Sequence, residues 1–464
     1  MKIGRTPRLQ WLLPLLTAFV MVVTSSCTTL ETGPEADEGE VAEPEDFLDF
    51  DEFLPALEFD RTGGAYVQPD PGGSTSSVDI YGPAVVHAGE HALQAHDVVN
   101  DNPLWSVSTE HGEADSRSVS ILEHGETVMA VATFETVRPG TGTAQDTPML
   151  EILAVDLLSG ETLWHNVTET GDGFWGRVIG LDGDSVILSG RGTQAFNAHD
   201  GSLLWSDEEM TPHLVDGGVV VASSEDSGSD LYDLHRLYGI DTETGDQVWE
   251  TWAEGDHETY SQAARDEYSA FLDTDPDPGE MVMAYGSLSG YDVHAVRSAG
   301  PGRFYVIASY TNEPWNLDIK GGVIALFDTA TGVANYSINH DPLTSGIQTR
   351  LGWGEASCSY DQGTNLACWV EDPGVTLVNI DVEAGEALWS EQFSWTSERR
   401  VIEPVSARDG VLYATVADEP IILDLEDGSD LVLDPGVAPD MTNGTIAVDY
   451  VSESDLFRAY PVTG

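Results

Sequence analysis

One short skeleton recurs along this chain and limits what the chain can fold into. Its clearest copy runs from Ala154 to Trp164 and contains an acid at Asp156 and a glycine at Gly160. The next two copies keep the same spacing; they are Ala195, Asn197, Gly201 and Trp205, and then Gly239, Asp241, Gly245 and Trp249. Three consecutive copies are too regular to arise by chance. We therefore interpret the skeleton as a repeated structural unit and not as a catalytic site.

Less regular copies extend the pattern in both directions. Those downstream are Asp328, Gly332 and Tyr336, then Asp381, Gly385 and Trp389, and then Asp424, Gly428 and Val432. Upstream, Ala95, Asp97 and Trp105 fit, with Asp101 where glycine is expected, and a last copy begins at Tyr460. The copies return about every 40 residues, a period typical of β-propellers with four strands per blade.

Each unit is predicted to form a strand, a turn and a second strand. The acid can accept hydrogen bonds from the backbone of its own turn, and glycine can adopt the positive φ that such a turn needs. A tryptophan in one isolated unit would stay half exposed. Neighbouring units that stack side by side bury it, which favours a ring of blades.

The skeleton resembles the tryptophan-docking repeat of the pyrroloquinoline quinone-like β-propellers, A-x-D-x-x-[ST]-G-x-x-x-W. The resemblance covers most of the chain from about residue 62 and is best from residue 154 to 249. It implies an all-β propeller fold. The family includes quinoprotein alcohol dehydrogenases and the propeller lipoprotein of the outer-membrane protein assembly machinery, so the resemblance does not by itself imply one function.

The number of blades is expected to be eight, with seven as the alternative. Residues 62 to 97 could form a complete first blade, which gives eight, or Trp105 could close the last blade, which gives seven. The interval from Asp241 to Asp328 is nearly twice the period. We interpret it as one blade with an insertion, in which residues 259–272 have helical spacing, although two blades would also fit.

The N-terminus has the pattern of an export signal. Basic residues precede an apolar run from Trp11 to Val23, and small residues then lead to Cys27. This order is typical of a bacterial lipoprotein signal, which would be removed so that Cys27 carries the lipid. The apolar run is short for a membrane span. We expect residues 1–27 to be the signal and the protein to be lipid-anchored on the outer face of the cell membrane.

Residues 28–60 are rich in acids, glycine and proline and contain no basic residue. Such a segment repels itself and buries little apolar surface, so we expect an acidic disordered linker. Phe47, Phe50, Phe53 and Leu57 interrupt it in a pattern that could also be a docking peptide. Residues 61–464 remain for the propeller.

Two of the three cysteines flank a predicted turn. If the strands around Cys358 and Cys368 pair as a hairpin, the two thiols lie opposite each other. That arrangement predicts a cross-strand disulfide in an exported protein, with two buried free thiols as the alternative.

The charge excludes one class of partner, and it leaves little chemistry to consider. A formal net charge of −63 argues against nucleic-acid binding and against approach to an anionic bilayer except through a lipid. Asp273, Asp275 and Asp277 alternate like the start of a calcium loop, but alanine stands where the bidentate glutamate belongs. A proline-stiffened acidic loop is the favoured interpretation, with a calcium site as the alternative and no other cofactor expected.

These observations predict a non-catalytic scaffold. We expect a monomer whose propeller binds an envelope protein, a peptide or a glycan. One alternative is a quinoprotein-like dehydrogenase that binds pyrroloquinoline quinone and calcium. Resemblance to those enzymes would imply adjacent cysteines, which this sequence lacks. Another alternative is a purely structural component of the cell surface.

Overall fold

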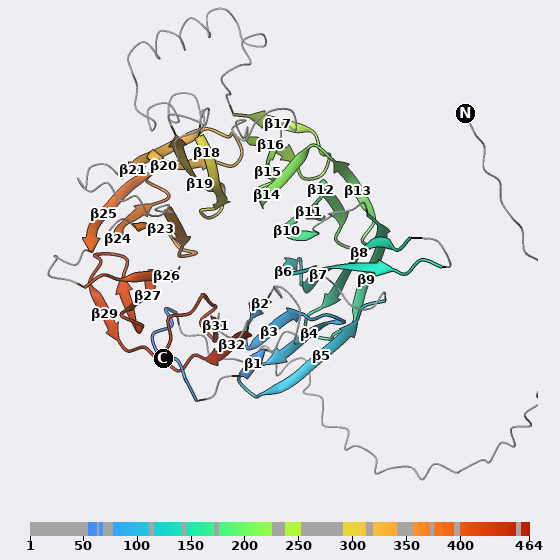
Figure 1. Ribbon diagram of the computed structural model, residues 1–464, viewed down its shortest axis with the longest axis horizontal. Coiled ribbons are helices and arrows are strands. Elements are labelled where there is room, and N and C mark those ends of the chain that lie inside the picture. Colours follow the sequence, from blue (N-terminus) through green and yellow to red (C-terminus); the bar gives the residue numbers. More distant parts are fainter. Residues whose placement is uncertain are drawn as a thin grey trace, which may run out of the picture. The chain divides into compact units, whose positions relative to one another are not determined.

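The computed structural model describes residues 54–62, 65–67, 78–110, 116–141, 145–170, 176–224, 237–251, 291–311, 319–340, 356–371, 375–393, 400–451 and 456–464. All of them lie in the unit Glu43–Gly464. Within this unit, 32 strands form eight four-stranded antiparallel sheets, and Figure 1 shows the sheets as blades around a ring. The prediction of an eight-bladed β-propeller is confirmed. The described residues include no helix that is long and apolar enough to cross a membrane.

The blades are numbered in chain order, and each is built from four strands. Blades 1 to 4 contain β2 (Val78–Tyr81), β3 (Ala84–Ala88), β4 (Ala92–Asp97), β5 (Asn102–Ser108), β6 (Ser116–His124), β7 (Thr127–Arg138), β8 (Thr147–Asp156), β9 (Thr162–Glu169), β10 (Arg177–Asp182), β11 (Ser185–Gly190), β12 (Gly192–Asn197), β13 (Leu203–Asp207), β14 (Met210–Asp216), β15 (Val219–Ser224), β16 (Leu237–Asp241) and β17 (Gln247–Glu250). Blades 5 to 8 contain β18 (Tyr291–Ser298), β19 (Arg303–Thr311), β20 (Ile319–Asp328), β21 (Ala334–His340), β22 (Ala356–Tyr360), β23 (Asn365–Glu371), β24 (Val375–Asp381), β25 (Glu386–Phe393), β26 (Glu403–Arg408), β27 (Val411–Val416), β28 (Glu419–Asp424), β29 (Asp430–Leu433), β30 (Met441–Thr442), β31 (Ile446–Val451), β32 (Leu456–Pro461) and β1 (Ala65–Val67).

The propeller closes differently from both arrangements expected from the sequence. Blade 1 spans Val78–Ser108 and contains Trp105 in its own outer strand, so both the predicted boundaries 62–97 and the closing role of Trp105 were wrong. Instead β1 pairs with β32 and supplies the outer strand of blade 8. Asp241 and Asp328 end strands of consecutive blades, which confirms one blade with an insertion. The insertion itself, including residues 259–272, lies outside the described residues.

The tryptophans of the skeleton dock onto the following blade. The indole nitrogen of Trp164 donates to the carbonyl oxygen of Ala198 at 2.8 Å, and Trp205 makes the same bond to Thr242 at 2.9 Å. Each ring also covers a glycine of the next blade. A Cβ added to Gly201 would lie 2.6 Å from the Trp164 ring. Trp105, Trp249 and Trp389 repeat the bond to Leu157, Thr329 and Leu425.

The turn that carries the acid and the glycine also has the predicted form. The carboxylate of Asp156 accepts a hydrogen bond from the backbone N–H of Ser159 at 2.8 Å, and Gly160 has a φ of +71°. In blade 1, Asp101 takes the place of the glycine with a φ of +54°. Aspartate is among the few residues that tolerate this conformation, so the turn survives the replacement.

The N-terminal segment from Leu54 to Thr62 is part of the propeller and not of a linker. Ala56 and Phe59 are buried, and the backbone N–H of Phe59 donates to Pro435 at 3.0 Å. The hydroxyl of Tyr413 in β27 donates to Ala56 at 2.9 Å. We call residues 54–62 the N-terminal strap. The expected boundary at residue 61 therefore moves to residue 54, and part of the apolar pattern in the acidic segment docks within the same chain.

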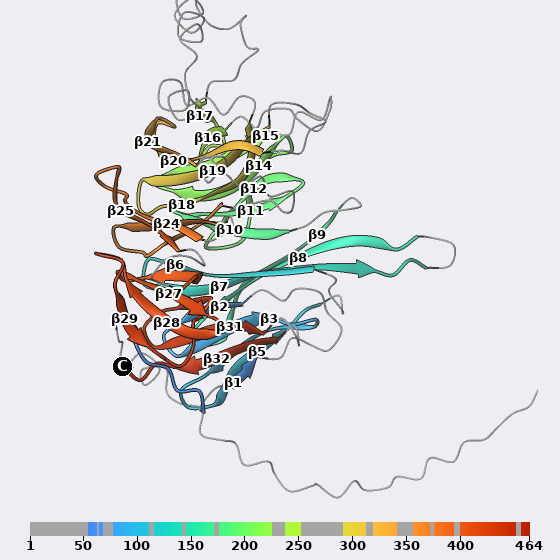
Figure 2. The same cartoon turned by 60° about the vertical axis from the view of Figure 1, so that its left-hand side comes forward.

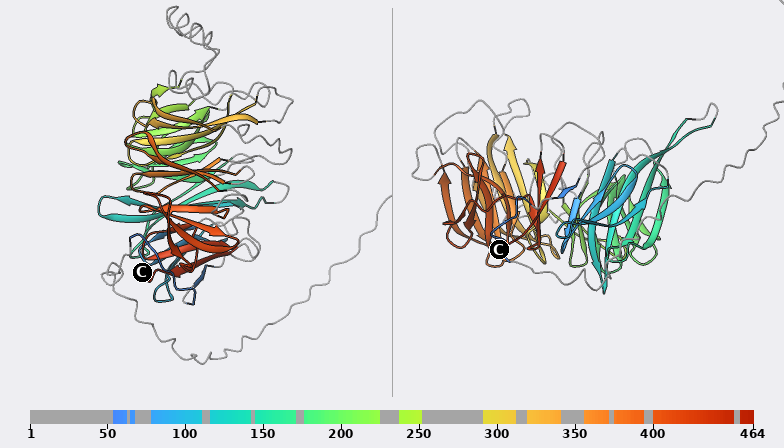
Figure 3. Two further views of the ribbon diagram at one scale, coloured as in Figure 1. Left: turned by 90° about the vertical axis from the view of Figure 1, so that its left-hand side faces the viewer. Right: turned by 90° about the horizontal axis from the view of Figure 1, so that it is seen from below.

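Two hairpins complete the description. Cys358 in β22 pairs directly with Cys368 in β23, and the two form a disulfide, which confirms that prediction. The hairpin of β7 and β8 is longer than the others and projects from the blades (Figures 2 and 3). Its strands pair from Met129 with Asp156 to Arg138 with Thr147, so the projection is a regular extension of the blade 2 sheet.

Candidate functional site

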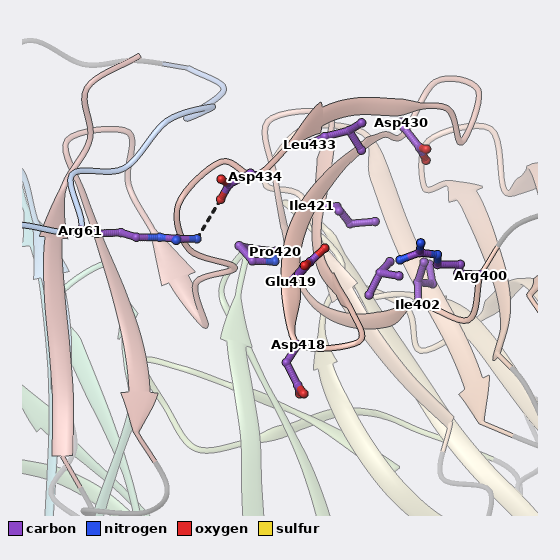
Figure 4. A pocket seen from close by; sticks show the side chains of 11 residues that line it. Arg61, Arg400, Ile402, Asp418, Glu419, Pro420, Ile421, Asp430, Leu433 and Asp434 are labelled. Atoms are coloured by element: carbon purple, nitrogen blue, oxygen red, sulfur yellow. Dashed lines mark hydrogen bonds and ion pairs between the residues drawn. The ribbon is translucent and has the colours of Figure 1, made fainter.

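A pocket with a volume of about 720 Å³ opens in blade 7, beside the turn between β27 and β28 (Figure 4). Its lining comes from the N-terminal strap, from the segment before β26, from the β27–β28 hairpin, and from β29 and the residue that follows it. The lining residues are Arg61, Arg400, Ile402, Val416, Asp418, Glu419, Pro420, Ile421, Asp430, Leu433 and Asp434. The N-terminal strap and blade 7, which are far apart in the sequence, therefore meet in one pocket.

A tight turn presents two of the acids. β27 ends at Val416 and β28 begins at Glu419, so only Ala417 and Asp418 connect them. Their φ values are +52° and +66°, the pair of positive values typical of a type I′ hairpin turn. This geometry is unusual for residues other than glycine. It sets Asp418 and Glu419 at the pocket, where both are exposed.

The two arginines of the pocket differ in their partners. Arg61 forms an ion pair with Asp434 at 3.0 Å and also donates to the carbonyl of Gly436. Arg400 is exposed, and it makes no hydrogen bond or ion pair with any residue that the structure describes. A guanidinium binds a carboxylate through two parallel hydrogen bonds, so Arg400 offers a contact for an acidic group of a ligand.

A second pocket of about 540 Å³ continues the first toward blade 8. The two share Arg61, Asp418 and Pro420. The second adds an acidic pair, Asp440 and Asp449, together with other side chains of blades 7 and 8, namely Val405, Thr415, Val437, Ala438, Tyr450, Arg458 and Tyr460. We call the two pockets together the blade 7–8 groove.

Burial and charge change the acidity of the two aspartates in this groove. Burial and, to a lesser extent, the nearby carboxylate of Asp440 together raise the pKa of Asp449 to about 6, against the opposing effect of Arg458. Burial also raises the pKa of Asp440, whose carboxylate accepts a hydrogen bond from the backbone of Tyr450. The Arg458 guanidinium lies 4.9 Å from the centre of the Tyr460 ring, a cation–π contact.

Exposed apolar side chains lie beside these charges. Leu433 at the end of β29 is 71% exposed and Tyr450 in β31 is 42% exposed. Ile402 and Ile421 line the larger pocket at greater depth. An apolar surface beside an open guanidinium and several carboxylates can hold a segment of mixed apolar and charged character.

The residues singled out from the sequence lie elsewhere. The acids, glycines and tryptophans of the skeleton are used in turns and blade junctions, as predicted. Cys27 and the three aspartates Asp273, Asp275 and Asp277 lie outside the described residues. The groove itself was not predicted. Its one signal was Val432, because blade 7 lacks the tryptophan that would otherwise dock onto blade 8.

A metal ion and a quinone would need different side chains. Among the described residues, one group of three side chains could hold a metal ion; it is formed by His124, Asp184 and His199 in blades 2 and 3. The adjacent cysteines that quinoprotein dehydrogenases would need are not present, since Cys358 and Cys368 bond to each other across a hairpin and Cys27 is distant in sequence.

The fold and its junctions define an eight-bladed β-propeller built from pyrroloquinoline quinone-like repeats. The family model described as outer membrane protein assembly factor BamB matches residues 148–431, which is more than half of the chain. The chain belongs to this family. A search of curated proteins finds no match.

Three solved structures that resemble the chain are distant from it in sequence. BamB from Moraxella catarrhalis is 12% identical, with coverage of 86% of this chain and 98% of that one and a TM-score of 0.45. Sqt1 from Saccharomyces cerevisiae is 9% identical, with coverage of 86% and 98% and a TM-score of 0.46. The quinohemoprotein alcohol dehydrogenase ADHIIG from Pseudomonas putida HK5 is 10% identical, with coverage of 86% and 75% and a TM-score of 0.43.

Proposed function

We propose that this protein is an exported, lipid-anchored scaffold whose blade 7–8 groove binds a segment of another envelope protein. The observation that carries the proposal is that the exposed side chains of Arg400 and Leu433 line one pocket of about 720 Å³. The family description, an outer membrane protein assembly factor, supports an envelope role. The lipoprotein signal predicted for residues 1–27 supports the anchor.

The larger pocket of the groove favours a protein segment over a glycan, because the aromatic side chains of the groove, Tyr450 and Tyr460, line the smaller pocket. Glycans are commonly held against aromatic rings, and the larger pocket has no aromatic residue among its described lining side chains. An extended segment with an acidic side chain and a large apolar side chain would match the charged and apolar side chains of this pocket. The acid would pair with Arg400, and the apolar side chain would cover Leu433 and Ile421.

The alternatives differ from this proposal in what they require. A dehydrogenase would need residues that bind quinone and calcium, including the adjacent cysteines that this sequence lacks. A purely structural surface component would need no stoichiometric partner. Neither alternative requires the groove, so substitutions in the groove separate the binding scaffold from both.

The test is recovery of a crosslinked partner from the bacterium that makes the protein. A tagged full chain is crosslinked in cells and purified, and the attached proteins are quantified by mass spectrometry. Leu433→Glu and Arg400→Glu should each lower the recovery of one protein at least about tenfold, the equivalent of about 1.4 kcal/mol of binding free energy. Leu203→Glu is the matched control, because Leu203 is 55% exposed in the outer strand of blade 3. Equal recovery with all three variants would contradict the proposal.

A further inference from the structure

Three potential metal ligands converge where blade 2 meets blade 3. His124 is the last residue of β6, Asp184 lies in the turn between β10 and β11, and His199 lies in the turn between β12 and β13. The Nε2 atom of His124 lies 2.8 Å from Oδ1 of Asp184, and Nε2 of His199 lies 3.4 Å from the same oxygen. One ligand atom from each residue lies within 4.8 Å of the others.

Hydrogen bonds hold the backbone of the two turns in blade 3 that carry Asp184 and His199. The N–H of His199 donates to the side-chain oxygen of Asn197 at 2.9 Å. A second hydrogen bond joins the two turns of blade 3, because the Ala198 N–H donates to the Asp184 carbonyl at 2.8 Å. Trp164 of blade 2 then holds the same turn through the carbonyl of Ala198. The backbone that carries Asp184 and His199 is therefore ordered before any ligand binds.

The repeat does not explain why histidine stands at residue 199. Equivalent positions, two residues after the acid, are occupied by other residue types in the other copies of the skeleton, namely Val99, Leu158, Glu243, Ala330, Glu383 and Glu426. The imidazole rings of His124 and His199 come from different blades, and their centres lie 4.5 Å apart at an angle of 70°. The turn thus folds without histidine, and the pairing of two imidazoles with one carboxylate is particular to this junction.

We propose that His124, Asp184 and His199 bind a divalent metal ion of the zinc class that clamps blade 2 to blade 3. Two imidazole nitrogens and one carboxylate oxygen are a common zinc ligand set, and they leave the fourth position of a tetrahedron open to water. Ligand atoms around a tetrahedral zinc lie about 3.3 Å from one another. The distances of 2.8 and 3.4 Å already approach that geometry.

The surroundings favour a cation and give it access. The side chains of Asp184 and His199 are each 66% exposed, whereas that of His124 is 16% exposed. One ligand is thus anchored in the junction and the other two face solvent. A protein with a formal net charge of −63 also concentrates cations near its surface.

The test uses the purified full chain with Zn²⁺ and Co²⁺ as probes, followed by calorimetry and by visible absorption of Co²⁺. Wild type should bind one tight equivalent and give the intense ligand-field bands of four-coordinate Co²⁺. His199→Ala and Asp184→Asn should weaken that site at least about 100-fold, because loss of an outer-shell partner alone costs about 10- to 100-fold. Both residues are exposed, and near-ultraviolet circular dichroism would verify the folds.

His96→Ala is the matched control. His96 forms a similar pair with Asp101 at 3.1 Å, but the group of three ligands does not include it. Its removal should leave the tight equivalent and the Co²⁺ bands unchanged. Absence of a tight equivalent in wild type would overturn the proposal and leave a hydrogen-bonded cluster only. Equal affinity in wild type and His199→Ala would overturn it as well.

Discussion

The space between neighbouring blades is filled differently at two places in the propeller. One is the junction between blades 2 and 3, and the other is the junction between blades 7 and 8, which we call the seam. At the first, Trp164 covers Gly201 and donates to Ala198, all within the repeated skeleton. At the second, Val432 stands where the tryptophan would be, and the N-terminal strap fills the space with Phe59 against Tyr413. The contact between blades 7 and 8 is thus completed by the N-terminal strap, which is not part of the repeat.

The two places also differ in whether their side chains are available to a protein partner. At the regular junctions the conspicuous residues are buried or bonded between blades, so they are not available to a ligand. At the seam, side chains from the strap and from blades 7 and 8 line an open groove. Such irregular elements carry function more often than the repeated framework that positions them.

The largest effect is expected at a regular junction. Trp164→Ala should lower the free energy of unfolding by about 3 to 5 kcal/mol, because it removes a buried ring and leaves a cavity between two blades. Chemical denaturation measures the change. Leu163→Ala, at the exposed neighbouring position, should change stability by less than about 0.5 kcal/mol. Similar losses for both would show that docking of the tryptophan does not hold the junction.

A somewhat smaller effect is expected at the seam. Phe59→Ala should cost about 3 kcal/mol, since Phe59 is buried among residues of blades 7 and 8. Leu54→Ala is the control, because Leu54 belongs to the same strap but is 48% exposed. The two variants are compared by denaturation and by limited proteolysis of the N-terminus. If Phe59→Ala were as stable as the control, the strap would not seal the ring.

The smallest effect concerns an acid of the groove and depends on pH. Asp449 has a pKa of about 6 in the folded protein against an ordinary value of 3.8, so the folded state holds a proton that the unfolded state has lost in this window. The contribution of Asp449 to stability therefore falls as pH rises from about 4 to about 6. Asp449→Asn should match wild type at pH 4 and exceed it by about 1 to 2 kcal/mol at pH 7, with allowance for partial exposure.

Asp418→Asn is the control for that experiment, because Asp418 is an exposed carboxylate of the same groove. Thermal or chemical denaturation at several pH values gives the two curves. An Asp449→Asn curve parallel to wild type between pH 4 and pH 6 would mean that burial does not act on this group as described.

The two regions also differ in how far the sequence could predict them. Regular spacing revealed the skeleton around Trp164, and with it the blades, the left-handed turns and the class of fold. The disulfide followed from the short separation of Cys358 and Cys368, which a hairpin turn can span. Local order of this kind is visible in sequence because each part lies within one or two repeats.

The seam could not be predicted in the same way. Phe59 packs on Tyr413, and Arg61 pairs with Asp434, which lies 373 positions away. Local periodicity contains no information about partners at such separation. The apolar residues of the acidic segment indicated that this segment could dock on a protein surface. They did not indicate the blade on which it docks. The pocket around Arg400 depends on this closure, so it was also not visible.

The central claim is that a protein partner binds at the seam between blades 7 and 8 and not along the regular blades. Equivalent outer-strand positions allow one direct test, in which a photo-crosslinking residue replaces Leu433 in blade 7 or Ser206, Glu250 or Ser390 in blades 3, 4 and 6. All four are exposed and directly follow the docking position of their strand. The account predicts a discrete partner adduct in cells from position 433 and none from the other three. Adducts of equal yield at all four positions, or an adduct at any of the other three alone, would contradict it.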